Sequence, residues 1–171
     1  DLDFFTFSHV NDHDFFDAQG HARDLAEDVF GSDSITLTDK GFLHNKSGMI
    51  IDIVADGSVN IGNFEPFGNL QTAHLKDLAA HKSSALCSRD EMKDYIDIAF
   101  LTKHQNWLLR DLSQFAEQKF RLGTISEEKL LTELLAKRVA FLLSPAIFLQ
   151  SPEENITIVT DQIEYLVQHT S

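Results

Sequence analysis

The hydrophobic pattern of the chain changes character near residue 70, and this change limits the folds that it can adopt. Before this point, short apolar or β-branched runs predict strands, and one helical pattern covers 15–30. The strands are expected at 2–7, 34–38 and 49–54. After this point, apolar residues recur with the period of a helix. These helices are expected at 72–87, 90–104, 107–120 and 126–143.

Strands that precede helices in this order are typical of the α+β class. We therefore predict an α+β fold, with a small mixed β-sheet and its helices followed by a helical C-terminal half. The sheet region is expected over 1–70 and the helical region over 71–171, either as separate regions or within one compact domain. Between the two patterns, 55–69 is predicted to be a loop. Near the end of the chain, the β-branched run at 156–159 predicts a short strand before a terminal helix at 161–169.

Composition excludes several classes of protein. The 171 residues are 43% hydrophobic, with 14 phenylalanines, which allows a substantial core and argues against intrinsic disorder. The longest uncharged apolar stretch, 139–150, contains Pro145 and is shorter than the ~20 residues of a membrane span, so no membrane partner is expected. Cys87 is the sole cysteine, which excludes an internal disulfide and a cysteine-based zinc site and suits a reducing cytoplasm.

The charge of the chain restricts how it could meet nucleic acid. There are 27 acidic and 14 basic side chains, for a formal net charge of −13. Phosphates are repelled by a surface of this sign, which argues against passive binding of DNA or RNA. The charge is compatible with an enzyme that meets phosphates through a divalent cation.

Three carboxylates in the strand region are candidate metal ligands. Asp1 and Asp3 are two residues apart, so both project from the same face of a strand. Asp52 interrupts an apolar run, where a buried carboxylate must be paired, hydrogen-bonded or bound to a metal. If the strand at 49–54 lies beside that at 2–7, the three carboxylates converge in a manner that suits Mg²⁺. The alternative is that Asp1 belongs to a frayed terminus and Asp52 marks a strand end.

The helical half adds charged residues to this set. Lys82 follows an apolar stripe and could reach inward to a phosphate as a point charge, although an ordinary solvated lysine is the alternative. Asp94 and Asp97 lie three residues apart on one helix face, with Arg89 nearby as a possible ion-pair partner. For these acids the alternative is a helix start favoured by the helix dipole.

These residues occur in an order that resembles a known family. The chain resembles the AbiEii/AbiGii-type nucleotidyltransferase toxins, within the DNA polymerase β-like nucleotidyltransferase superfamily. The resemblance covers roughly residues 1–120. It is carried by Asp1-Leu2-Asp3-Phe4-Phe5-Thr6, by Ile51-Asp52-Ile53, by Leu75-Lys76-Asp77-Leu78-Ala79-Ala80-His81-Lys82, and by Arg89 with Lys93-Asp94-Tyr95-Ile96-Asp97-Ile98-Ala99-Phe100-Leu101.

The resemblance implies a role for each matching residue. Asp1, Asp3 and Asp52 would be the Mg²⁺ ligands, and Asp52 could also activate the acceptor. Lys82 would bind the nucleotide and neutralise its phosphates, and Asp94 would be a catalytic acid near the acceptor or the lysine. The resemblance places Asp52, Lys82 and Asp94 together as the catalytic set.

The implied activity is transfer of a nucleoside monophosphate from an NTP to an RNA, protein or nucleotide acceptor. The family context implies the toxin of a toxin–antitoxin or phage-defence pair, with an antitoxin protein as partner. Family members carry a glycine-rich segment before the first acidic strand, and nothing precedes Asp1 in the sequence, so we expect a natural protein that is longer at this end. Asp97 is expected to pair with Arg89 or Lys93. The alternative function is a catalytically degenerate or truncated nucleotidyltransferase-fold protein that acts by binding a partner.

Overall fold

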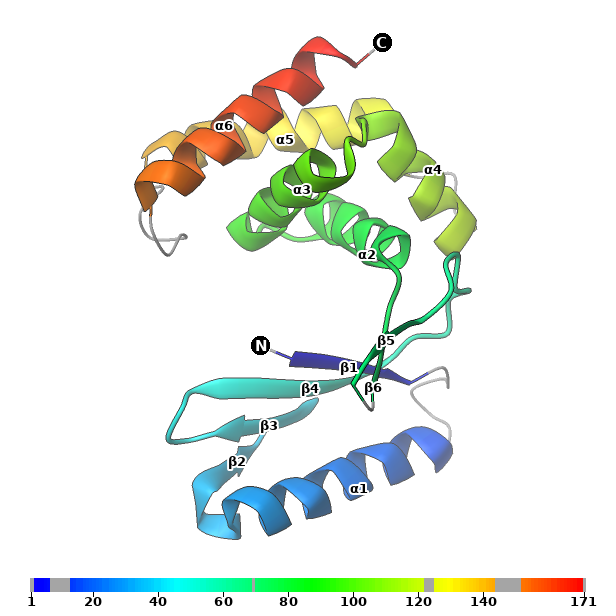
Figure 1. Cartoon of the computed structure of the whole chain (residues 1–171), viewed down its shortest axis with the longest axis vertical. Coiled ribbons are helices and arrows are strands. Elements are labelled where there is room, and N and C mark those ends of the chain that lie inside the picture. Colours follow the sequence, from blue (N-terminus) through cyan, green and yellow to red (C-terminus); the bar gives the residue numbers. More distant parts are fainter. Residues whose placement is uncertain (1, 7–12, 69, 122–124, 144–151, 171) are drawn as a thin grey trace. The chain divides into compact units, whose positions relative to one another are not determined.

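The computed structural model describes residues 2–6, 13–68, 70–121, 125–143 and 152–170, and its class is α+β, as predicted. The chain divides into two compact units, Asp1–Ser58 and Val59–Ser171. The division lies earlier than the expected change near residue 70. It leaves the four-stranded sheet in the first unit and the helical half in the second (Figure 1).

The first unit is a mixed sheet with one long helix. Its strands are β1 (Leu2–Thr6), β2 (Ile35–Leu37), β3 (Gly41–His44) and β4 (Met49–Ala55). They are arranged in the order β1-β4-β3-β2, with β1 parallel to β4 and the other neighbours antiparallel. Helix α1 (His13–Phe30) connects β1 to a short 3₁₀ turn, η1 (Ser32–Ser34), and packs along the sheet (Figure 1).

Alternation along β4 separates a buried core face from a half-buried face. Ile51 is buried with Phe42 and Ala26, so this side of the sheet packs against α1. Because successive side chains of a strand point to opposite faces, Asp52 projects from the other side. Gly41 is the β3 partner of Asp52, and a Cβ there would collide with the carbonyl oxygen of Ile51. Glycine is therefore required at this position, and no β3 side chain stands beside Asp52.

The second unit is a helical assembly that begins with a small hairpin. Strands β5 (Glu65–Phe67) and β6 (Leu70–Thr72) pair antiparallel. The helices are α2 (Leu75–Ser88), α3 (Met92–Gln105), α4 (Leu109–Phe120), α5 (Glu127–Leu143) and α6 (Pro152–Gln168). The core takes fully buried side chains from each of them, including Leu86, Ile98, Leu112, Leu134 and Ile163. None of the described helices is long and apolar enough to cross a membrane.

Two local predictions in the second unit were wrong. The strand expected at 156–159 is helical and belongs to α6, because Val159, Ile163 and Leu166 recur with a helical period and are buried together. The burial of this stripe outweighs the β-propensity of the run. The loop expected at 55–69 ends in β5, whose three residues are too short to give a periodic signal.

A buried ion pair joins α2 and α4 to the segment that opens the second unit. The Nζ atom of Lys119 lies 2.9 Å from Oδ1 of Asp77 and also donates to the carbonyl of Val59. The carboxylate of Asp77 accepts from the backbone N–H groups of Ile61 and Gly62, at 3.0 Å each. Both ends of the pair are thus hydrogen-bonded, as buried charges require.

Candidate functional site

The predicted strand pairing is present in the first unit. Strands β1 and β4 are parallel neighbours, and their register places Asp3 opposite Asp52. Backbones of neighbouring strands lie about 4.8 Å apart. The register therefore brings two of the three predicted metal ligands to adjacent positions on the sheet. Asp1 lies outside the described residues, as does the side chain of Asp3.

Asp52 stands in an environment that is unusual for a carboxylate. It is half-buried, and its chain neighbours Ile51 and Ile53 are buried. Its carboxylate forms no hydrogen bond or ion pair with any residue that the structure describes. A partly desolvated carboxylate without a protein partner is costly, and a bound cation would offset that cost.

Carboxylate oxygens such as those of Asp3 and Asp52 are the ligands that a hard divalent cation prefers. No group of three or more His, Cys, Asp or Glu side chains with metal-site geometry occurs among the described side chains. Mg²⁺ requires few protein ligands, since it keeps several waters and is completed by substrate phosphates. Asp52, with Asp3 beside it in register, is the part of the sheet that suits such an ion.

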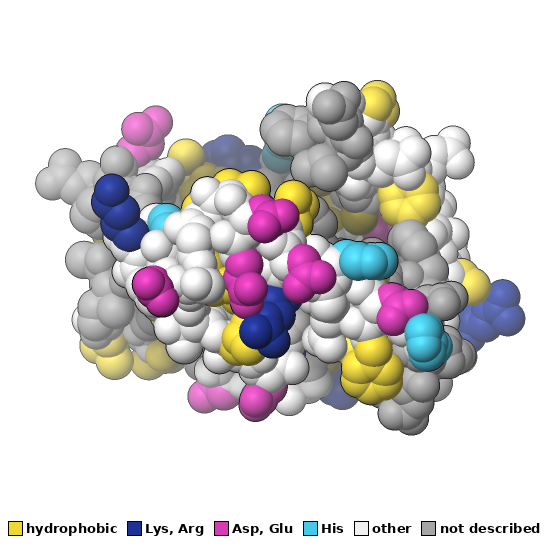
Figure 2. All heavy atoms as spheres, turned by 90° about the horizontal axis from the view of Figure 1, so that it is seen from below, with side chains coloured by type: hydrophobic (Ala, Val, Ile, Leu, Met, Phe, Trp, Pro, Cys, Tyr) yellow, Lys and Arg dark blue, Asp and Glu magenta, His cyan; other side chains and the backbone are white. Residues whose placement is uncertain are grey.

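The other face of the first unit is unsuited to phosphate. Figure 2 shows acidic side chains (magenta) gathered over α1, with histidines (cyan) among them. Asp17, Asp24 and Asp28 are all exposed on this helix, and His13 pairs with Asp17 at 2.9 Å. A surface of this sign repels a nucleotide. The face that carries Asp52 is therefore the candidate site in this unit.

In the second unit, the predicted lysine and acids do meet. The Nζ atom of Lys82, on α2, lies 2.6 Å from Oδ2 of Asp97 and 3.6 Å from Oδ1 of Asp94, both on α3. About a quarter of the Lys82 side chain, 23%, remains exposed. We call Lys82, Arg89, Asp94 and Asp97 the α2–α3 cluster. The ammonium of Lys82 is held at the surface between two carboxylates.

Arg89 compensates the negative charge of Asp94 within the α2–α3 cluster. Its Nε and Nη2 atoms donate to the two carboxylate oxygens of Asp94 at 2.7 and 2.9 Å, a bidentate pair of the strong type. Asp94 is fully buried, so this pair compensates a charge that has no access to water. Asp97 was expected to pair with Arg89 or Lys93, and instead its partner is Lys82. Lys93 pairs with Glu91.

Comparisons with known proteins do not assign the chain to a family. No family model matches it, and no curated protein or solved structure gives a significant match.

The candidate residues form two groups, one in each unit. The first group is a half-buried carboxylate with a second aspartate beside it in register, an arrangement that can bind a cation. The second group presents a partly exposed ammonium on a balanced ionic cluster, which can bind a phosphate. Two further charged residues of the second unit, Lys119 and Lys137, are buried, and neither was expected from the sequence.

Proposed function

We propose that the chain is a Mg²⁺-dependent nucleotidyltransferase that moves a nucleoside monophosphate from an NTP to an acceptor. The observation that carries the proposal is Asp52: a half-buried carboxylate without a partner among the described residues, adjacent in register to Asp3. Two features of the sequence also support the proposal. The acidic strands, Lys82 and Asp94 follow one another along the chain in the expected order, and the chain resembles the AbiEii/AbiGii-type toxins.

Each candidate residue has a definite task in this proposal. Asp3 and Asp52, with Asp1, would hold Mg²⁺, which supplies positive charge to the triphosphate oxygens. Lys82 would bind a phosphate oxygen, exchanging its contact with the half-buried Asp97 for one with the substrate. Asp94 remains bound to Arg89 and keeps the charges beside Lys82 fixed.

The transfer step requires one proton acceptor. As the acceptor oxygen bonds to the α-phosphorus, the bond from that phosphorus to pyrophosphate breaks, and pyrophosphate leaves. The proton of the acceptor hydroxyl passes to a carboxylate. Asp52 suits this role better than Asp94, because both oxygens of Asp94 are occupied by Arg89. Rate enhancement comes from in-line positioning and charge neutralisation.

The proposal is tested by label transfer and by metal binding. The chain, expressed from its full reading frame, is incubated with each α-labelled NTP, Mg²⁺, and cellular RNA or protein as acceptor. We expect Mg²⁺-dependent labelling that falls on the order of 100-fold in Asp52→Asn and Asp3→Asn. Asp28→Asn removes an exposed acid of α1 and should leave it unchanged.

Metal binding provides a readout that does not depend on the acceptor. Mn²⁺, a spectroscopic substitute for Mg²⁺, should bind to the wild type and to Asp28→Asn, and less tightly to Asp52→Asn. Transfer that survives Asp52→Asn, or absence of both labelling and Mn²⁺ binding in the wild type, would refute the proposal.

A partner-binding function is the second candidate, and a specific surface favours it. Helix α5 exposes Leu135, Val139, Leu142 and Leu143 along one side, with Val139 and Leu143 exposed by 63% and 78%. Their spacing forms an apolar stripe of the kind that packs against another helix. An antitoxin protein would be compatible with this stripe in either candidate function. A protein that acts only as a binding module would keep its partner when Asp52 is replaced by Asn and would show no transfer.

A further inference from the structure

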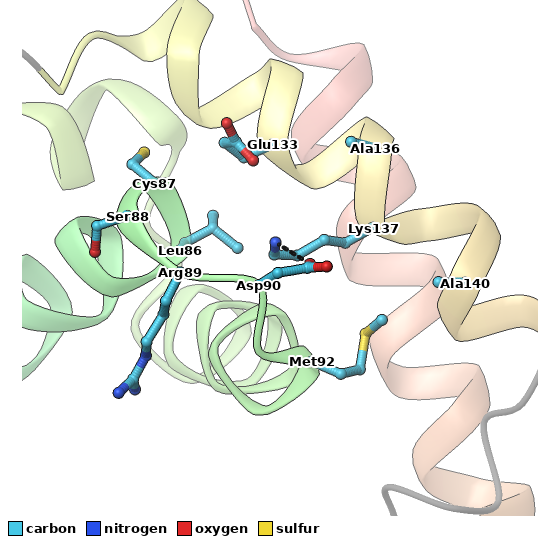
Figure 3. Close-up of a pocket in the computed structure, with 10 residues that line it drawn as sticks. All are labelled: Leu86, Cys87, Ser88, Arg89, Asp90, Met92, Glu133, Ala136, Lys137 and Ala140. Carbon is cyan, nitrogen blue, oxygen red and sulfur yellow. Dashed lines mark hydrogen bonds and ion pairs between the residues drawn. The ribbon is translucent and has the colours of Figure 1, made fainter.

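A pocket of about 430 Å³ opens in the second unit (Figure 3), and of the α2–α3 cluster only Arg89 is among its lining residues. It is lined by the end of α2, the connection from α2 to α3, and one side of α5. Its volume is within the range of small-molecule sites. The proposed function assigns no substrate contact to the residues that line this pocket.

The centre of the pocket is a buried ammonium with an exposed partner. The side chain of Lys137 is only 7% exposed, and its Nζ atom donates to Oδ1 of Asp90 at 2.9 Å. The side chain of Asp90 is 99% exposed. Figure 3 shows these two groups meeting in the middle of the pocket. An ammonium has three N–H donors, so Lys137 can donate to a ligand while Asp90 remains beside it.

The pocket also offers negative charge. Glu133 lies one helical turn before Lys137 on α5, so the two side chains share a face of the helix. Its carboxylate forms no hydrogen bond or ion pair with a described residue. Arg89 also lines the pocket, but its guanidinium is bound to Asp94 and points away in Figure 3. One cation and two carboxylates therefore face the pocket.

Apolar groups make up most of the remaining wall. Met92, Ala136 and Ala140 lie on the side of the pocket away from Cys87 (Figure 3). Burial raises the pKa of the Cys87 thiol above its ordinary value. The charges of Lys129 and Lys137 lower this pKa and that of Glu133 raises it, and the net shift is upward. The thiol is therefore neutral near pH 7 and adds a weakly polar surface.

We propose that this pocket binds a small zwitterion of the α-amino-acid class that carries an apolar side chain. The carboxylate of the ligand accepts hydrogen bonds from Lys137, and its ammonium lies between the carboxylates of Asp90 and Glu133. Its side chain rests on Met92 and Ala136.

Charge complementarity distinguishes this ligand from simpler ones. A plain carboxylate would meet Asp90 and Glu133 in a protein whose net charge is already −13. A plain amine would meet Lys137. A zwitterion places each of its charges against the opposite one, and recognition of both charges makes binding specific.

Three probes of similar shape test the proposal. They are L-leucine, 4-methylpentanoate, which lacks the ammonium, and 3-methylbutylamine, which lacks the carboxylate. Calorimetry should give leucine a Kd on the order of 1 mM, and should show binding at least ~10-fold weaker for the other two. Cys87, as the sole cysteine, gives a second readout, because bound leucine should slow its alkylation by iodoacetamide.

Variants link binding to the named groups. Lys137→Met keeps the buried stem and removes the charge, and Glu133→Gln is a near-isosteric change at a half-buried position. Each should weaken leucine binding by about 10-fold, equivalent to ~1.4 kcal/mol. Lys103→Met removes an exposed lysine near the end of α3 that does not line the pocket, and should bind leucine normally.

The proposal is overturned by any of three results. The first is that leucine at about 20 mM, well above the expected Kd, changes neither the heat signal nor the alkylation of Cys87. The second is that one of the singly charged probes binds as tightly as leucine. The third is that Glu133→Gln and Lys103→Met have equal effects on leucine binding.

Discussion

The ion pair between Asp77 and Lys119 provides the sharpest test of the energetics of the second unit. Replacing Lys119 with Met keeps most of the aliphatic volume in place and removes the ammonium. The carboxylate of Asp77, 3% exposed, would retain only the N–H groups of Ile61 and Gly62 as partners. The carbonyl of Val59 would lose its Nζ donor.

The expected loss of stability follows from this geometry. Removing one partner of a buried, hydrogen-bonded ion pair costs about 3–5 kcal/mol, because the other charge remains buried without compensation. The two backbone hydrogen bonds to Asp77 place the expected cost towards the lower end. For a unit of this size, such a loss lowers the Tm by roughly 10–20 °C.

The loss should depend on pH. Burial alone would raise the pKa of Asp77, but Lys119 and the two backbone N–H groups outweigh it, and the pKa lies below the ordinary value of 3.8. A carboxyl whose pKa is lowered by folding stabilises the protein fully above its unfolded pKa and loses this stabilisation as the pH falls through its folded pKa. The wild type should therefore weaken below about pH 4. In Lys119→Met the pKa of Asp77 rises, so the difference from wild type should shrink as the pH falls from 7.

Trp107 makes this measurement specific to the second unit, since it is the only tryptophan and packs against Phe115 on α4. Urea unfolding followed by its fluorescence gives the free energy at each pH. Lys103→Met, an exposed lysine of α3, is the matched control and should change stability by less than about 0.5 kcal/mol. A loss below about 1 kcal/mol in Lys119→Met at pH 7, or a loss that is the same at pH 7 and near pH 4.5, would refute the reasoning.

Three further predictions test the fold and the α2–α3 cluster. Gly41→Ala should destabilise the first unit by more than about 2 kcal/mol, because the added Cβ would collide with the backbone of β4. Gly20→Ala has open space around it inside α1 and should stabilise the same unit by roughly 0.5–1 kcal/mol; circular dichroism during thermal unfolding compares the two variants. Arg89→Lys loses the bidentate contact with Asp94 and should cost about 1–3 kcal/mol in urea unfolding, a result that Lys93→Arg should not reproduce. Burial raises the pKa of Tyr95 to about 12, so its phenol should titrate near that value by ultraviolet absorbance, and the folded state should lose stability above about pH 10, where the unfolded phenol ionises first.

Elements with strong periodicity were predictable, and those decided by distant contacts were not. The helix expected at 126–143 is found at Glu127–Leu143, and the strand expected at 49–54 at Met49–Ala55, because each has a clear apolar pattern. The run at 156–159 has strand-like side chains, yet it lies in α6 because its partners in the core are spaced for a helix. In this run, β-propensity had less influence than the burial of the apolar side chains.

The candidate site was predictable in residue types and less so in pairing. Asp52 was recognisable as an acid in an apolar strand, but its register with Asp3 depends on which strands are neighbours. The partner of Asp97 was mispredicted: it pairs with Lys82 rather than with Arg89 or Lys93, because α2 packs beside α3 and brings Lys82 within reach. A signal for Lys119 did exist: it continues the buried stripe of Leu112 and Phe115 at helical spacing, where a charge requires a buried partner.

Asp52 in the first unit and Asp94 in the second differ in electrostatic state, and this difference separates their roles. Asp94 is fully buried, and Arg89 already compensates its charge through both oxygens, so binding a metal would require breaking that pair. Asp52 has no such partner to lose among the described residues. If both were metal ligands, Asp94→Asn and Asp52→Asn would weaken Mn²⁺ binding alike. The geometry instead implies that Asp94→Asn lowers the stability of the second unit and displaces Lys82, while Mn²⁺ affinity is reduced only by changes at the sheet.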